Sequence, residues 1–180
     1  MSVNLSARHL VLVGMMGAGK STVGKRCAAR LERPFVDTDE IIETVAGMPV
    51  AEVFAHDGEE AFREMERAAI ADACATPTPL VIAAGGGAVL DAENRRRMRE
   101  HGLVVWLQAP VAQLATRVGD GTSRPLLRGD ATGTLTRLQR LRQPAYEAAA
   151  HATIDTSGLS VAAVVEAVLV TLEATSERVP

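Results

Sequence analysis

Residues 9–22 read HLVLVGMMGAGKST, a mainly apolar run followed at once by glycines, a lysine and two hydroxyl residues. The run from His9 to Val13 is short and continuous, which predicts a buried strand that ends at Gly14. From Lys20 to Leu31 apolar residues recur at helical spacing, and a helix is expected there. A glycine-rich turn therefore joins a strand to a helix.

This turn, GMMGAGKS at 14–21, fits the pattern G-x-x-x-x-G-K-[ST] of phosphate-binding loops. Glycines let consecutive backbone N–H groups point at phosphate oxygens, and the helix N-terminus adds positive potential. Lys20 would lie on the β- and γ-phosphates, and Ser21 would offer its hydroxyl to Mg²⁺. Such a loop predicts a nucleotide but leaves the reaction open. The residues assigned to ATP here are Gly17, Ala18, Gly19, Lys20, Ser21 and Thr22.

Strand and helix patterns alternate along the rest of the 180-residue chain, without a linker to divide it. This alternation predicts a single α/β domain, in which a parallel sheet is covered by helices on both faces. Ligands of such sheets bind beyond the carboxyl ends of the strands. Further strands are expected at 34–37, 80–83, 103–107 and 152–154, and helices at 38–74 (broken near 47–49 and 57–58), 91–100, 111–118, 135–149 and 160–173, the last capped by Ser160.

The bulk composition argues against a nucleic-acid-binding protein and against a membrane protein. The net charge is −3 and the basic residues form no run, which argues against nucleic acid. Cys27 and Cys74 lack ligand-like spacing, so buried thiols are expected. The N-terminal apolar run is too short for a signal peptide or a membrane span. We therefore expect a cytoplasmic protein and, because no segment indicates an interface, a monomer.

Two aspartates follow the second expected strand, in Asp37-Thr38-Asp39. Side chains two apart on an extended chain share a side, so both carboxylates are expected in the cleft. One would hold hydrated Mg²⁺, and the other would orient or deprotonate an acceptor hydroxyl. The third strand lacks the terminal Asp of many P-loop ATPases, which favours Asp37 for the metal. The alternative is a helix N-cap formed by Thr38 or Asp39.

A glycine triplet and several arginines complete the candidate groups. Gly85-Gly86-Gly87 ends the third strand and would let the backbone approach a ligand, although a plain turn is the alternative. Arg63 and Glu66 are spaced to pair on one helix, as many solvated ion pairs do.

Two further segments carry arginines. Arg124 lies in a Gly-bounded segment typical of a mobile lid, where it could neutralise the transferring phosphate or do nothing. Pro144, just after Arg142, is expected to end or kink its helix. Arg117 indicates nothing by itself.

Taken together, these motifs resemble the shikimate kinases from His9 to about Glu173. Only the first is distinctive alone, but their order and spacing as a set are specific. The resemblance implies a three-layer nucleoside monophosphate kinase fold with a five-stranded parallel sheet, a substrate-binding region at about 38–66 and a lid at about 119–130. The carriers are GMMGAGKST at 14–22, DTD at 37–39, FREME at 62–66, GGG at 85–87, SRPLL at 123–127 and RQPAY at 142–146.

The resemblance also implies a reaction, in which the γ-phosphoryl group of ATP passes to the 3-hydroxyl of shikimate. Glu66 would hold Arg63 in place, and Arg117 would lie against adenine. Mg²⁺ would bind at Ser21 and, through water, at Asp37. The implied catalytic residues are Lys20, Asp39 and Arg124, with Lys20 and Arg124 on the phosphates, and the implied shikimate contacts are Asp39, Arg63, Gly85, Gly86, Gly87 and Arg142.

Other functions remain as alternatives. A gluconate kinase would share the loop and the lid, but the combination of DTD, FREME and RQPAY is not expected in it. A nucleoside monophosphate kinase would need a second site that reads a base. A GTPase-like switch would need an Asn-Lys-x-Asp segment, which the chain lacks. A nucleotide-dependent chaperone is left for a turnover assay to exclude.

Overall fold

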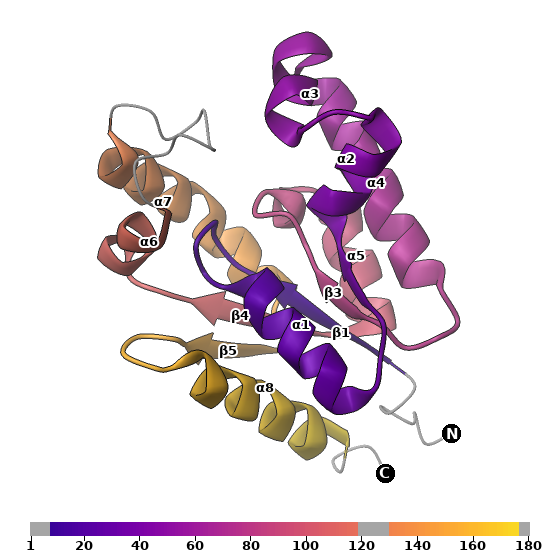
Figure 1. Cartoon of the computed structure of the whole chain (residues 1–180), viewed down its shortest axis with the longest axis vertical. Coiled ribbons are helices and arrows are strands. Elements are labelled where there is room, and N and C mark those ends of the chain that lie inside the picture. The colour runs from indigo at the N-terminus through magenta and orange to yellow at the C-terminus, as the bar shows by residue number, and fades with distance from the viewer. Residues whose placement is uncertain (1–7, 119–129, 177–180) are drawn as a thin grey trace.

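The computed structural model describes residues 8–118 and 130–176 and confirms the predicted α/β fold (Figure 1). Five strands form one sheet in the order β2-β3-β1-β4-β5, and every neighbouring pair is parallel. All five strands lie where the hydrophobic pattern predicts them. They are β1 (His9–Val13), β2 (Phe35–Asp37), β3 (Val81–Ala83), β4 (Gly102–Gln108) and β5 (Ala152–Asp155).

Helices cover both faces of this sheet. Helices α1 and α8 pack together in front of it, while α4, α5 and α7 pack behind it (Figure 1). Helices α2 and α3 and the start of α4 stand beyond the carboxyl end of β2. The bounds are α1 (Lys20–Leu31), α2 (Thr38–Ala46), α3 (Val50–His56), α4 (Gly58–Ala75), the 3₁₀ turn η2 (Ala88–Leu90), α5 (Ala92–His101), α6 (Val111–Val118), α7 (Ala131–Ala149) and α8 (Val161–Ser176).

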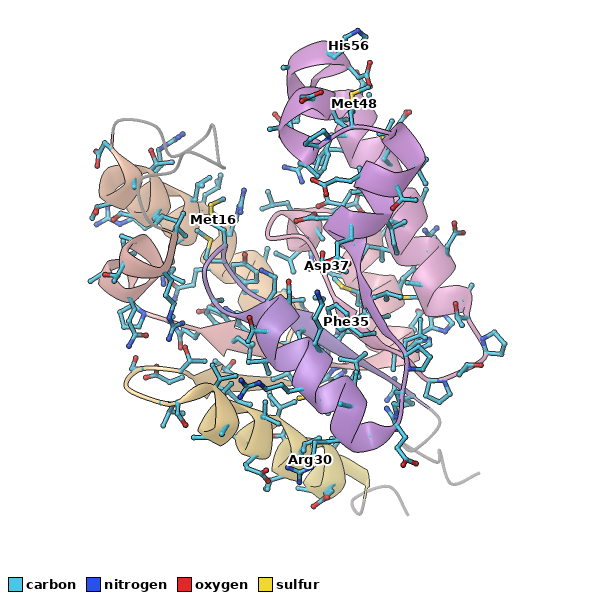
Figure 2. All side chains as sticks on the ribbon, viewed as in Figure 1. Met16, Arg30, Phe35, Asp37, Met48 and His56 are labelled. Atoms are coloured by element: carbon cyan, nitrogen blue, oxygen red, sulfur yellow. The ribbon has the colours of Figure 1, made fainter. Side chains whose placement is uncertain are left out.

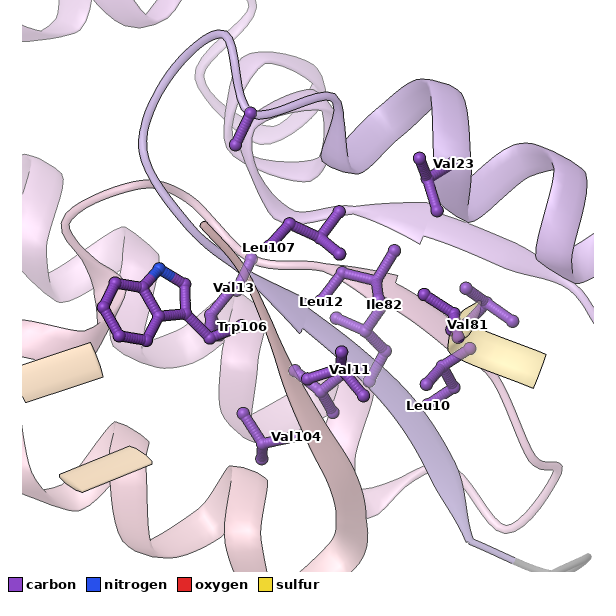
Figure 3. Packing of buried hydrophobic residues seen from close by; sticks show 14 of the residues in the cluster. Leu10, Val11, Leu12, Val13, Val23, Val81, Ile82, Val104, Trp106 and Leu107 are labelled. Carbon is purple, nitrogen blue, oxygen red and sulfur yellow. The ribbon is translucent and has the colours of Figure 1, made fainter. Parts of the chain in front are cut away.

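The main core is aliphatic, as the low aromatic content predicts. Every residue of β1 is buried, and its side chains pack with those of β3 and β4, Trp106 among them (Figure 3). Cys27 and Cys74 are free and buried in this core, as expected. A second, smaller cluster of Ile42, Val53, Phe62 and Ala69 joins α2, α3 and α4. The predicted substrate-binding region at 38–66 thus has apolar packing of its own.

Two local expectations, an end of the helix at Pro144 and a cap at Thr38 or Asp39, differ from the structure. Pro144 does not end α7, which continues to Ala149. Although proline lacks the N–H of a helical hydrogen bond, its neighbours Arg142 and Tyr146 are both buried, and their tertiary contacts hold the helix together. The N-cap of α2 is Asp37 rather than Thr38 or Asp39. The predicted Ser160 cap is present, as its hydroxyl accepts the Ala163 amide at 3.2 Å.

The buried ring of His9 links β1 to the connection between α4 and β3. Its Nδ1 accepts the Leu80 amide at 3.0 Å, and its Nε2 lies 3.2 Å from the Cys74 carbonyl. A backbone amide only donates, so the ring must be neutral with its hydrogen on Nε2. Burial lowers the pKa of His9 below its ordinary value.

No helix in the described residues is long and apolar enough to cross a bilayer.

We expect the free energy of unfolding to fall as the pH drops from about 7 to about 5. Because the folded state disfavours protonated His9, the unfolded chain binds the proton more readily below the ordinary histidine pKa. A His9→Asn variant keeps a side-chain hydrogen-bond acceptor but does not titrate. Its free energy of unfolding should therefore fall less over the same pH range. Urea unfolding followed by circular dichroism would measure both proteins. Equal declines in both proteins would show that His9 does not carry the effect.

Candidate active site

A cavity of about 720 Å³ opens at the carboxyl ends of the strands. Met16, in the glycine-rich loop, and Asp37, at the end of β2, both lie at this end of the molecule (Figure 2). The cavity brings together most of the residues singled out in the sequence. Those that line it are Gly17, Ala18, Gly19, Lys20, Ser21, Thr22, Asp37, Asp39, Arg63, Gly86, Gly87, Arg117 and Arg142.

Two sequence assignments are not among these lining residues. Gly85 is buried beneath the cavity, where its amide donates to the Thr38 hydroxyl at 2.9 Å. Arg124 lies outside the described residues, as does nearly all of the predicted lid at 119–130. Those two assignments stay predictions.

The glycine-rich loop has a conformation that its sequence makes possible. At Gly14, where φ is +149°, an added Cβ would lie 2.6 Å from the Leu107 carbonyl oxygen of β4. The loop therefore packs directly on the neighbouring strand. The Lys20 ammonium donates to the carbonyls of Gly14 at 2.8 Å and Met15 at 3.1 Å. From the outer side, Arg117 of α6 donates to the Gly17 carbonyl at 3.3 Å.

Ser21 and Asp37 meet at the centre of the cavity. The Ser21 hydroxyl donates to Asp37 Oδ2 at 2.6 Å, while Asp37 Oδ1 accepts the Asp39 amide at 3.0 Å and caps α2. Oxygen donors of this kind suit Mg²⁺. Among the described residues no cluster of three or more His, Cys, Asp or Glu side chains could hold a metal.

Asp39 reaches the cavity by a different geometry from the one expected. It lies in the first turn of α2, so it does not share an extended strand with Asp37. The cap that the sequence offered as an alternative to a functional role is formed by Asp37, whose carboxylate also bonds Ser21. Both carboxylates still line the cavity, because the helix starts at the strand end.

Arg63 and Glu66 form a buried pair on α4. Arg63 donates to Glu66 Oε2 at 2.7 Å and to the exposed Glu59 at 3.2 Å. Glu66 is only 1% exposed, and its Oε1 has no hydrogen-bond partner among the described residues. Burial raises the pKa of Glu66, and the Arg63 charge opposes that shift. Because Glu66 is shielded from water while the Arg63 side chain is 22% exposed, the pair holds the Arg63 guanidinium more firmly than a fully solvated pair would.

Each glycine of the triplet faces a charged side chain. An added Cβ at Gly85 would lie 2.7 Å from Asp39 Oδ1 and 2.9 Å from Glu66 Oε1. At Gly87 it would lie 2.6 Å from an Arg63 nitrogen, and at Gly86 it would lie 3.2 Å from an Arg142 nitrogen. A plain turn would not need three such positions. The triplet is what allows these charges to converge on one strip of backbone.

Arg142 approaches the same strip from α7 and is only 7% exposed. Its Nε has no hydrogen-bond partner among the described residues. A buried guanidinium with an unused donor favours an anionic ligand. The cavity therefore places two guanidiniums that could hold an anion beside Gly86 and Gly87, together with the glycine-rich loop and the carboxylates of Asp37 and Asp39.

Sequence reasoning missed three residues of this region. Thr38 holds the Gly85 amide, and the Tyr146 hydroxyl donates to the Gly86 carbonyl at 2.6 Å. Phe54 packs on Phe62 with ring centroids 4.4 Å apart, and both line the cavity. The signal for Thr38 and Tyr146 was their place in the DTD and RQPAY motifs, whereas nothing in the sequence marked Phe54.

Comparisons with known proteins agree on one family. The family model described as shikimate kinase matches residues 16–173. A shikimate kinase of Symbiobacterium thermophilum is 47% identical over 173 residues, which cover 94% of this chain and 99% of the relative. One of Caulobacter vibrioides is 46% identical over 170 residues, covering 93% and 84% respectively.

Solved structures extend the agreement. Shikimate kinase from Acinetobacter baumannii in complex with shikimate superposes with a TM-score of 0.89 at 34% identity, covering 93% of this chain and 94% of the other. A gluconokinase from Sinorhizobium meliloti gives a TM-score of 0.65 at 22% identity, covering 95% and 94%. The second likeness shows the fold alone.

The two carboxylates on Arg63 offer a matched test. Glu66→Gln should raise the KM of the phosphoryl acceptor about tenfold, because the buried guanidinium loses its charged partner. Glu59→Gln should change that KM by less than about twofold, since exposed ion pairs contribute little. Steady-state kinetics at saturating ATP would measure both. Equal effects of the two variants would mean that the buried pair has no special part in holding Arg63.

Proposed function

This chain belongs to the shikimate kinase family, and we propose that the cavity at the carboxyl end of its sheet is where the family's reaction takes place. The enzyme transfers the γ-phosphoryl group of ATP to the 3-hydroxyl of shikimate, giving shikimate 3-phosphate and ADP, a step toward the aromatic amino acids. The observation that carries the proposed site is the convergence of Arg63 and Arg142 on Gly86 and Gly87, in the same cavity as the phosphate loop.

We assign the shikimate carboxylate to Arg63 and Arg142. A planar guanidinium binds a carboxylate through two parallel hydrogen bonds, and two guanidiniums from separate helices would fix the position of the ring. The unused Nε of buried Arg142 supports this assignment. Asp39, beside Gly85, would then accept hydrogen bonds from ring hydroxyls and direct the 3-hydroxyl toward the donor. Gluconate also carries a carboxylate, so gluconate kinase is the alternative that the substrate panel below must exclude.

We assign ATP to the glycine-rich loop. The backbone amides from Gly17 to Thr22, at the positive end of α1, suit the phosphates, and Lys20 would move its ammonium from the loop carbonyls onto them. Arg117, exposed above Gly17, would lie against adenine. Arg124, outside the described residues, would address the transferring phosphate.

Catalysis then rests on positioning and on neutralisation of charge. With the acceptor and the donor fixed in one cavity, the 3-hydroxyl can lie in line with the γ-phosphate, which removes much of the entropic barrier. Asp39 would accept the hydroxyl proton or orient it, and Lys20 would neutralise charge that develops on the phosphoryl oxygens. Ser21 and, through water, Asp37 would hold Mg²⁺, which when bound screens the phosphate charges.

We also propose a cytoplasmic monomer. No segment of the sequence indicates an interface between copies of the chain. Cys27 and Cys74 are free thiols, which suits a reducing compartment. Nothing in the charge distribution suggests a nucleic-acid partner, since the net charge is −3 without a basic run.

An ADP-release assay with ATP and Mg²⁺ tests the activity directly. Wild-type enzyme should turn over shikimate, and gluconate and nucleoside monophosphates should give at most about a hundredth of its kcat/KM. Lys20→Met should lower kcat for shikimate by at least about tenfold, or about 1.4 kcal/mol in barrier height, with the melting temperature unchanged. Methionine keeps the apolar stem of the lysine but not its charge. A gluconate preference would overturn the substrate, and a fully active Lys20→Met would overturn the loop assignment.

The carboxylate clamp predicts non-additive losses in a double-mutant cycle. Replacing shikimate by its methyl ester should cost several kcal/mol in wild type, because each charge-assisted bond contributes about 1.5–3 kcal/mol. The same replacement should cost much less in Arg63→Ala or Arg142→Ala, where part of the clamp is already gone. Arg→Lys at either position should not restore full activity, because a point charge lacks the fork.

The measurement is kcat/KM for the acid and the ester in wild type and in both alanine variants. Losses that simply add would show that neither arginine senses the carboxylate, and the proposed orientation of shikimate would then be wrong. Arg30→Ala is a suitable control, because Arg30 pairs with the exposed Glu166 on the far helix α8.

A further inference from the structure

Tyr146 is the only tyrosine of the chain and stands one helical turn after Arg142 on α7. Its side chain is fully buried, with an exposed fraction of 0%. It lies outside the set of residues that line the cavity. No role has so far been given to it in binding or catalysis, although its hydroxyl reaches the backbone of the glycine triplet.

The Tyr146 hydroxyl connects two parts of the proposed acceptor site. It donates to the Gly86 carbonyl at 2.6 Å. The Arg142 guanidinium faces the same glycine, since a Cβ added at Gly86 would lie 3.2 Å from an Arg142 nitrogen. Burial raises the pKa of Tyr146 to about 12, against the opposing effect of Arg142. The phenol therefore stays protonated, and keeps its donor, throughout the physiological range.

The hydrogen bond to the Gly86 carbonyl also fixes the direction of the Gly87 amide N–H, which is a hydrogen-bond donor. The Gly86 carbonyl and the Gly87 amide belong to one trans peptide, in which C=O and N–H point in opposite directions. In the part of the chain that the structure describes, the amides of Gly86 and Gly87 donate to no protein acceptor. Both residues line the cavity. The hydroxyl thereby sets the orientation of an amide that remains available to a ligand.

The Tyr146 ring is tied to the strand that supports the nucleotide loop. It stacks on Trp106 with centroids 5.3 Å apart and planes at 16°. Trp106 lies on β4 opposite Val13 of β1, immediately before Gly14. Strands β1 and β4 also support the glycine-rich loop. Through Trp106, Tyr146 therefore connects the proposed shikimate-binding groups to the same two strands that hold the proposed ATP-binding loop.

We propose that Tyr146 is a positioning residue for shikimate, which holds the Gly86–Gly87 peptide beside the Arg142 guanidinium in the arrangement that binds the acceptor. The inference rests on the proposed placement of shikimate at Arg142. A neutral phenol suits this position because its hydroxyl donates to the Gly86 carbonyl and adds no charge beside Arg142. The ring packs on Trp106, and the hydroxyl fixes the orientation of the Gly86–Gly87 peptide.

Tyr146→Phe separates these two contributions, because it keeps the ring and removes the hydroxyl. We expect the KM and the Kd of shikimate to rise about tenfold, with the KM of ATP within about twofold of wild type. Val168→Ala is the control for lost stability, since Val168 is buried on α8 and does not line the cavity. It should lower the melting temperature without raising the KM of shikimate.

A second measurement does not need a substitution that removes the hydroxyl. Uniform incorporation of 3-fluorotyrosine labels Tyr146 alone, because the chain has no other tyrosine. The single ¹⁹F resonance should shift as shikimate is added, in step with its Kd. A resonance that does not respond to saturating shikimate, or a Tyr146→Phe enzyme whose KM for shikimate is unchanged or rises only together with that for ATP, would overturn the inference.

Wild-type turnover in the same assay distinguishes a failure of the proposed function from a failure of the role proposed for Tyr146. Wild-type activity on shikimate combined with an unaffected Tyr146→Phe enzyme would overturn the role of Tyr146 alone. Absence of wild-type turnover would overturn the proposed function and the inference with it.

Discussion

Strand β1 must satisfy its backbone hydrogen bonds while buried along its whole length, and the rest of the molecule is arranged around that requirement. It is paired with β3 on one side and β4 on the other. The carboxyl ends of these parallel strands therefore lie side by side. Gly14 at the end of β1, the triplet from Gly85 to Gly87 after β3, and Leu107 near the end of β4 become neighbours. The active-site cavity follows from this pairing.

The cavity contains buried charged side chains whose hydrogen bonds are incomplete, an arrangement that lowers the stability of the folded protein. Glu66 is almost completely buried and has an unused acceptor, and buried Arg142 has an unused donor. Unsatisfied groups of this kind cost free energy in the ligand-free state. Part of that cost is offset by the Arg63–Glu66 pair. Such a site is organised for a charged ligand before the ligand arrives, which reduces the ordering needed on binding.

Sequence patterns were a sound guide to elements and a weaker guide to geometry. All five strands were placed correctly, because their apolar runs are short and bounded by Gly, Pro or Asp. Pro144 shows a limit of local reasoning, since propensity predicts an end or a kink at this residue and α7 does not end there, with Arg142 and Tyr146 on either side of it buried. Asp39 shows the same limit, because it faces the cavity from a helix and not from a strand.

The sequence by itself determined the fold class, the phosphate loop and the family resemblance, because each depends on residue types at fixed local spacing. Only the tertiary structure decided which charges meet. A spacing of three residues allows Arg63 and Glu66 to pair, but burial makes that pair part of the site. Separate helices approach one strand end, the end of β3. Their side chains leave no room for a Cβ at 85–87, and the Tyr146 hydroxyl bonds the Gly86 carbonyl although sixty positions of chain separate the two residues. No local pattern encodes distances of that kind.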